Sequence, residues 1–289
     1  SQTPMKLPAL SQKNINILAG WLMFAIGSLV YILTTEPTAP LWDCPEYTAT
    51  AVKLEVGHPP GAPLFQMMGA VISNMFDVDP TRIAFMMNVF ACLAGGVAIM
   101  LLLWVITYFG KRIVGKNWGE LSTPTFAAVI GSGIVGSAAI LFSDTFWFNA
   151  TESEVYSLAN TFTVLVFYCA IRWADGFGRP RNNKWLILIA LLVGLAPGVH
   201  FMGMLGVPAV VMIYYFKTTE KKITTKRFIL ANLVAAAILV LIFGAIFPFL
   251  INSFGAADIF LVNTLGAPFH TGTILWAVLL TGICVFLLW

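Results

Sequence analysis

Long apolar runs separated by short polar stretches make up most of this chain. We interpret eight of them as membrane crossings, at about 14–34, 83–109, 124–142, 155–173, 185–199, 201–216, 228–250 and 273–289. A helix needs roughly 20 apolar residues to span the hydrocarbon core of a bilayer. Few strand-like alternations interrupt the runs, so helices are favoured over a barrel. The pattern predicts an all-α integral membrane protein built as a polytopic helical bundle.

The fifth and sixth runs are short and form one apolar block from Trp185 to Phe216, with "APGVH" in its middle. We interpret the block as a tight hairpin whose tip, near His200, reaches the far face; a single long tilted helix is the alternative. With the hairpin, only Lys53 and Arg82 of the 16 cations fall on the outer side. Because cations gather on the cytoplasmic side, the hairpin and a cytoplasmic N-terminus are favoured.

Composition agrees with a membrane protein. Apolar residues are 59% and charged residues 10% of the chain, and mean hydropathy is +0.87. A soluble domain carries about 25% charged residues. The predicted topology places the following acids and histidines on the outer side: Glu36, Asp43, Glu46, Glu55, Asp77, Asp79, Asp144, Glu152, Glu154, Asp258, His58, His200 and His270. An outward-facing site is the simplest cause of this asymmetry.

The stretch "LWDCPEYTATAVKLEVGHPPG", residues 41–61, carries the first candidate site. Asp43, a proline in the first turn and Glu46 three residues later form a capping-box pattern, which explains both acids structurally. The same spacing also places two carboxylates at one helix end, where one can accept a proton while the other positions it. A short amphipathic helix follows at the membrane interface. It ends at "GHPPG", which leaves His58 on a rigid, exposed corner.

A second polar group lies in "SDTFWFNATESEVYSLAN", residues 143–160. Glu152 sits at the head of an outgoing helix, where an acid complements the helix dipole. Glu154, Tyr156 and Asn160 lie deeper in an apolar segment, and polar side chains there usually face a bundle interior or cavity. His200 at the hairpin tip is either a cavity-lining group or a hydrogen-bonded residue that closes a turn.

Several kinds of site are absent from the sequence. No glycine-rich nucleotide motif and no histidine–acid spacing of a metalloenzyme occurs. The four cysteines form no CxxC pair, so neither a zinc site nor a disulfide framework is indicated. We therefore expect no metal ligands, no cofactor and no nucleic-acid partner, although a requirement for a divalent ion is not excluded.

Taken together, "WDCPEY", "GHPPGAPLFQMMG", "WFNATESEVYSLAN" and "GLAPGVH" resemble the integral-membrane family called domain of unknown function 2723, in the same order over nearly the whole chain. The resemblance implies a GT-C type glycosyltransferase that moves a sugar, mannose above all, from a polyprenyl-phosphate donor to a protein hydroxyl. The vertebrate member of the family is an O-mannosyltransferase. For a bacterial member it implies the inner membrane, a site facing the periplasm and a secreted or envelope protein as acceptor.

The resemblance also implies roles for single residues. Asp43 and Glu46 occupy the place of the catalytic acid in the first extracytoplasmic loop, residues 35–82, with one of them as the base of an inverting transfer. Glu154, Tyr156, Asn160 and His200 are expected to line the donor or acceptor cavity.

His58 is expected either to fix the loop or to approach the donor phosphate, and Lys53 and Arg82 are further candidates for contact with that phosphate. Residues 1–289 form one transmembrane domain, expected to be the N-terminal membrane part of a longer protein. A transporter or lipid flippase with an outward-facing polar cavity is the alternative, because broken helices such as "LAPGVHF" are typical of transporter sites.

Overall fold

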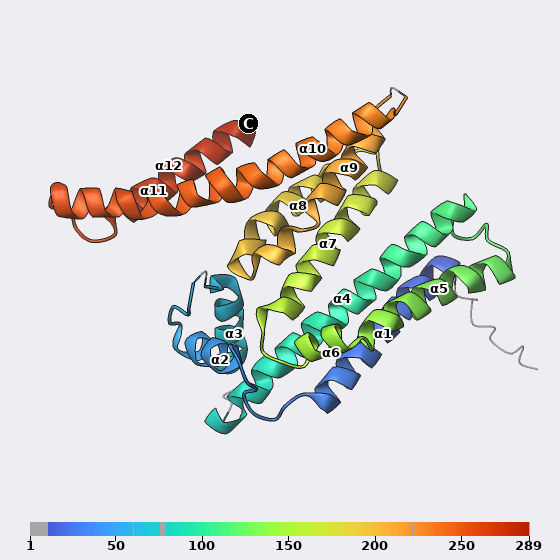
Figure 1. The fold of residues 1–289 in the computed structure, drawn as a ribbon, viewed down its shortest axis with the longest axis horizontal. Helices are drawn as coiled ribbons and strands as arrows, with labels where there is room; N and C mark the ends of the chain where they lie inside the picture. The colour runs from blue at the N-terminus through green and yellow to red at the C-terminus, as the bar shows by residue number, and fades with distance from the viewer. Residues whose placement is uncertain (1–10, 60, 76–78, 221, 289) are drawn as a thin grey trace, which may run out of the picture. The chain divides into compact units, whose positions relative to one another are not determined.

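The computed structural model describes residues 11–59, 61–75, 79–220 and 222–288, and within them every regular element is a helix (Figure 1). Six helices are long and apolar enough to cross a membrane: Gln12–Thr34, Pro80–Val114, Thr123–Leu141, Val155–Asp175, Phe201–Thr218 and Thr225–Thr264. Two shorter apolar helices, Lys184–Gly198 and Thr271–Phe286, complete the set. Each of the eight expected crossings is thus helical, which confirms the polytopic helical class.

The chain divides into two compact units, Ser1–Thr218 and Thr219–Trp289. The elements of the first unit are α1 (Gln12–Thr34), α2 (Cys44–Lys53), α3 (Pro63–Met75), η1 (Pro80–Arg82), α4 (Ile83–Val114), α5 (Thr123–Leu141), α6 (Asp144–Ala150), α7 (Val155–Asp175), α8 (Lys184–Leu195), η2 (Ala196–Gly198), η3 (Phe201–Met204) and α9 (Val207–Thr218). Those of the second are α10 (Thr225–Leu241), η4 (Ile242–Ile246), α11 (Phe247–Ile259), η5 (Phe260–Thr264) and α12 (Thr271–Leu288).

The central helix of the first unit is α4, which packs against α1, α5 and α7 (Figure 1). Small residues bring the helices together: a Cβ at Gly96 would collide with the Ser28 hydroxyl of α1. Two hydroxyls of α7 donate to carbonyls of α4. Ser157 donates to the Ala91 carbonyl at 2.7 Å, and Thr161 donates to the Ala94 carbonyl at 2.6 Å. Close approach and inter-helix hydrogen bonds are the usual means of holding helices together in lipid, where the hydrophobic effect gives no such force.

The short runs at 185–199 and 201–216 form the expected hairpin. At its open end, the Trp185 ring lies against Arg172 near the end of α7, and Tyr214 of α9 stacks on Trp173 with ring centroids 5.2 Å apart. At its tip, the Met202 carbonyl accepts from Thr163, near the beginning of α7, at 3.0 Å. The chain therefore runs along α7 in one direction as α8 and returns as α9, and the alternative of one long helix is wrong.

Two helices of the loops were not predicted. The α3 helix follows the turn at Gly61, and α6 lies between α5 and α7. The amphipathic helix α2 is shorter than its pattern indicates, because Leu54 adopts the left-handed conformation at φ 53° and its amide bonds back to Ala51. Asp77, which the sequence places on the outer side, and Pro60 of "GHPPG" are not among the described residues.

The second unit is a helical hairpin. Thr225–Thr264 is continuously helical, so the crossing expected at 228–250 is longer than its pattern indicates. Asp258, expected in an outer loop, lies within α11, and its carboxylate accepts from the amides of Gly272 and Thr273 at 3.0 and 3.2 Å. It therefore caps the beginning of α12, which is a structural role.

Candidate functional site

The backbone around α2 leaves both of its acids uncommitted to capping. Asp43 stands at the N-cap position, but its backbone is already helical (φ −84°, ψ −10°) and its side chain caps no amide. A capping side chain normally requires an extended N-cap backbone. Trp42, with φ at 67°, makes the sharp turn that precedes the helix. The capping-box interpretation of Asp43 and Glu46 is therefore wrong.

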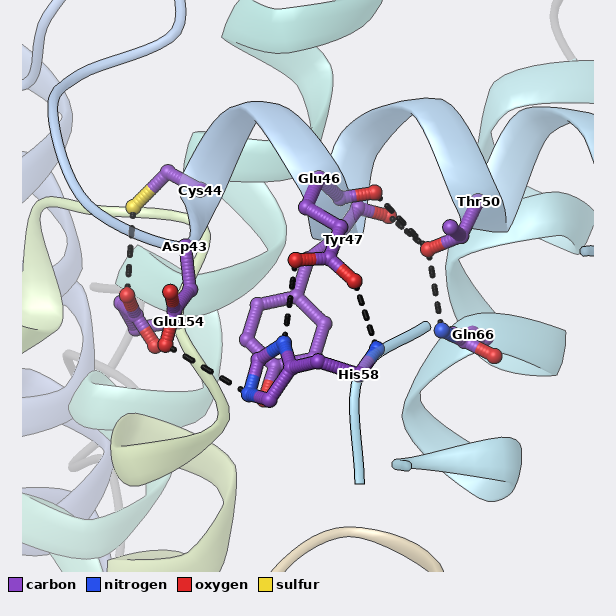
Figure 2. A network of polar contacts seen from close by, with 8 residues as sticks. All are labelled: Asp43, Cys44, Glu46, Tyr47, Thr50, His58, Gln66 and Glu154. Atoms are coloured by element: carbon purple, nitrogen blue, oxygen red, sulfur yellow. Dashed lines mark hydrogen bonds and ion pairs between the residues drawn. The ribbon is translucent and has the colours of Figure 1, made fainter. Parts of the chain in front are cut away.

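The carboxylate of Glu46 instead binds His58. Its Oε1 accepts from the His58 backbone amide at 2.6 Å, and its Oε2 lies 3.0 Å from His58 Nδ1. On the other side of the ring, His58 Nε2 lies 3.7 Å from Oδ2 of Asp43 (Figure 2). One imidazole thus lies between the two carboxylates, and the chain at Gly57 and His58 is folded back onto the beginning of α2.

These contacts set the charges of the cluster. The hydrogen bond that its ring makes to Glu46, and the nearby negative charges, raise the pKa of His58, and the two bonds that His58 donates lower the pKa of Glu46. The side chains stay 39–52% exposed, so water screens the effect. Because Glu46 is hydrogen-bonded to one ring nitrogen and the Asp43 carboxylate lies 3.7 Å from the other, the arrangement favours the protonated form of the ring.

A small scaffold holds this cluster in place. The Tyr47 ring lies 5.8 Å from the His58 ring, and Gln66 of α3 donates to the Thr50 hydroxyl at 2.9 Å. A Cβ at Gly57 would lie 3.2 Å from Glu46 Oε1, so a larger residue there would press on the carboxylate. Sequence reasoning missed Gln66 and Gly57; the proline at the start of α3 was the available signal for its helix.

Glu154 forms a second, buried part of the site. It is 7% exposed, and Cys44 lies with Sγ 3.7 Å from its carboxylate and 4.0 Å from that of Glu152 (Figure 2). Burial, followed by the charge of Asp43, raises the pKa of Glu154. Burial and the two glutamates raise the pKa of the Cys44 thiol to about 12, so the thiol stays protonated and donates. The structure thus brings Glu154 beside Asp43, as the sequence predicts for one shared site.

Tyr156 and His200 form a separate pair. Their rings meet edge to face at 5.1 Å, and Nδ1 of His200 accepts the Met202 amide at 3.1 Å, which leaves Nε2 as the donor. Asn160 lies half-buried one turn further along α7. The hairpin tip reaches the same end of the bundle as the acids, since a Cβ at Gly198 would lie 2.9 Å from Leu64 of α3.

Two predicted phosphate ligands are not part of this arrangement. Lys53 in the last turn of α2 and Arg82 of η1 are both exposed. Among the hydrogen bonds and ion pairs of the described residues, none joins either cation to Asp43, Glu46 or His58. The group closest to the carboxylates that can carry a positive charge is therefore His58.

A metal ion has one set of possible ligands in the described part of the chain. Atoms of Asp43, Glu46 and His58 all lie within 4.8 Å of one another. Carboxylate and imidazole groups suit a small divalent cation. In the observed arrangement His58 is hydrogen-bonded to Glu46 and lies near Asp43, so a cation bound by all three would take the place of the His58–Glu46 ring contact. A hollow of about 600 Å³ lies instead over α6, lined by residues between Asp144 and Thr151.

Comparison with known proteins gives the chain its family. Residues 43–224, more than half of the chain, match the family described as "Protein O-mannosyl-transferase TMEM260 N-terminal domain". The matched segment begins at Asp43 and contains every predicted site residue. Its description supports the O-mannosyltransferase part of the resemblance, although not the designation as a domain of unknown function.

Two curated relatives carry the same kind of name. "Protein O-mannosyl-transferase TMEM260" of Mus musculus is 27% identical over 174 residues, which are 60% of this chain and 22% of the relative. "Protein O-mannosyl-transferase tmem260" of Dictyostelium discoideum is 20% identical over 224 residues, 74% of this chain and 25% of the relative. The chain spans about a quarter of these relatives, and no solved structure matches it. On the match over residues 43–224, the chain belongs to the protein O-mannosyl-transferase TMEM260 N-terminal domain family.

Proposed function

We propose that this chain carries the active site of a membrane glycosyltransferase of the GT-C type. It transfers a sugar, mannose in the first instance, from a polyprenyl-phosphate donor to a hydroxyl of a secreted or envelope protein. The names of the two relatives support the transferase class and the protein acceptor. The helical bundle, with its carboxylates gathered at one end, supports a site at the membrane surface. We place that end outside the cytoplasm, in a bacterium at the periplasmic face of the inner membrane.

One observation carries the assignment of the base: Asp43 is the carboxylate left free to react. Glu46 is held by two bonds from His58, and Glu154 is buried against Cys44. Asp43 is 52% exposed at its side chain and has only the longer contact of 3.7 Å to His58. A general base must reach the proton that it removes, and among these acids Asp43 is the most accessible.

The mechanism follows from the separate roles of these three acids. The acceptor oxygen attacks the anomeric carbon on the face opposite the phosphate, its proton passes to Asp43, and the bond from carbon to the phosphate oxygen breaks with inversion. The leaving group departs as a phosphate anion, so it needs no strong acid, unlike the leaving group of a glycoside hydrolase. It needs positive or hydrogen-bonding groups nearby. His58, held by Glu46, is placed to supply a hydrogen-bond donor there, and a positive charge when its ring is protonated.

The remaining predicted residues fit around this centre. Tyr156, Asn160 and His200 contact the sugar or the acceptor through their rings and hydrogen-bond donors. Glu154 stabilises the buried side of the site. Lys53 and Arg82 reach the phosphate only if the loop moves on binding. The reaction as written requires no metal ion and no cofactor.

The test uses the full-length protein in lipid with polyprenyl-phosphate-mannose and an acceptor protein. Asp43→Asn is expected to retain donor binding and to lose transfer by about 10²–10⁴-fold, the usual contribution of a positioned base. Glu55→Gln, an exposed acid of the same loop, is the matched control and should transfer normally. Normal transfer by Asp43→Asn would move the base to another carboxylate.

Binding of no lipid-linked sugar by the full-length protein would instead favour a transporter or flippase. One feature points to that class: η2 and η3 interrupt the apolar hairpin beside His200, and broken helices commonly form transporter sites.

A further inference from the structure

The connection between α7 and α8, residues 172–184, carries four cations, and we call it the basic loop. Arg172 lies in the last turn of α7, Arg179 and Arg181 follow, and Lys184 begins α8. All four side chains are exposed. Among the ion pairs of the described residues, none joins them to an acid, and the neighbouring Asp175 is already paired with an arginine of α4. The loop therefore presents positive charge that no acid compensates in the described part of the chain.

The basic loop is a built structure. Asn182 donates from Nδ2 to the Trp173 carbonyl at 2.8 Å, and its Oδ1 occupies the space where a Cβ at Gly176 would stand. The Arg179 amide bonds to the Gly176 carbonyl at 3.0 Å. These contacts close the chain into consecutive turns and fix where the cations project.

Arg181 shows that one of these positions is strained. Its φ is +58°, in the left-handed region that glycine adopts without steric cost and arginine does not. Strained backbone of this kind persists where the surrounding structure overdetermines it, and it clusters at binding sites. The strain holds a cation in place in an exposed turn.

Aromatic rings lie beside two cations of the basic loop and one cation of α9. Arg172 and Lys184 lie 5.5 and 5.6 Å from the centroid of the same Trp185 ring, and Lys217 of α9 lies 6.0 Å from Phe177. Two cations beside one indole ring concentrate positive charge there, and a bound anion balances it. Tryptophan and cations mark the level of lipid head groups, and the apolar spans Val155–Asp175 and Phe201–Thr218, both long enough to cross a membrane, end here.

We propose that the basic loop binds the phosphate of an anionic phospholipid head group, in the leaflet at the end of the bundle opposite the carboxylates. Charge complementarity and the position at the ends of three apolar helices favour a lipid over a soluble anion. Each cation near an anionic membrane surface strengthens binding about fivefold. This proposal is independent of the proposed sugar transfer.

The test compares the full-length protein in bilayers of phosphatidylcholine with and without phosphatidylglycerol. Retained lipid is counted by native mass spectrometry, and the rise in thermal midpoint caused by phosphatidylglycerol is recorded. Arg172→Gln/Lys184→Gln is expected to bind phosphatidylglycerol at least tenfold more weakly and to lose most of that rise. Lys13→Gln/Lys116→Gln removes two exposed cations at the same end of the bundle but outside the basic loop, and should lose clearly less phosphatidylglycerol binding and less of the midpoint rise than the basic-loop pair.

Arg181→Gly separates binding from folding. It removes a charge and the backbone strain together, so its midpoint in phosphatidylcholine should equal or exceed that of the wild type, while its response to phosphatidylglycerol falls. Equal losses in the basic-loop and control pairs would reduce the effect to general surface charge and overturn the proposal. A response reproduced by inorganic phosphate alone would overturn the lipid as the ligand.

Discussion

Replacing Asn88 with leucine tests whether α4 holds the loop that delivers Asp43. Asn88 is fully buried, and its Nδ2 donates to the carbonyls of Glu36 and Thr38 at 2.9 and 3.1 Å. Losing two such bonds costs about 2 kcal/mol. Two factors reduce that cost: Glu36 and Thr38 are exposed, so water replaces the donor, and Oδ1 of Asn88 is buried without a partner. We expect a net loss of about 1 kcal/mol in the free energy of unfolding.

The effect of Asn88→Leu on sugar transfer should be larger than its effect on stability. The bonds fix the chain only five residues before Asp43, and displacing a catalytic group by about 1 Å can cost up to 10²-fold in rate. Transfer by the purified full-length protein is therefore expected to fall about 10–100-fold, with the unfolding free energy measured in parallel by denaturant titration in detergent. Asn232→Leu, which replaces an exposed amide bonded within its own helix, is the control. Wild-type transfer by Asn88→Leu would refute the anchoring role.

Three further outcomes are expected. Gly96→Ala pushes a Cβ into α1 and should cost about 1–3 kcal/mol of unfolding free energy, whereas Gly131→Ala, with open space around it, should be neutral or slightly stabilising. In an NMR titration the pKa of His58 should lie above 6.5, and in Glu46→Gln it should return toward 6.5. The contact between His58 and Glu46 therefore stabilises the fold fully below pH 6.5, and this stabilisation is lost as the pH rises through the raised pKa. Burial raises the pKa of Glu154, so Glu154→Gln should gain thermal stability over the wild type as the pH rises above 4.5; an equal midpoint at every pH contradicts this.

The sequence alone determined the class of fold and the end of the bundle that carries the site. Apolar runs of sufficient length fix helices in a bilayer, because no other open structure satisfies the backbone there. The distribution of lysine and arginine distinguished a hairpin near His200 from one long helix. Since successive crossings alternate in direction, these facts also placed Asp43, Glu154 and His200 at one end.

The tertiary structure decided what each polar residue does there. The sequence "DCPE" is compatible with a capping box and with a free carboxylate pair, and the choice depends on a contact with His58, twelve residues after Glu46. The anchoring of the loop by Asn88 depends on a partner 52 residues away. Local sequence patterns indicate helix periodicity and burial. The packing of separate helices and turns decides which side chains form hydrogen bonds with one another, and this packing depends on residues far apart in the sequence.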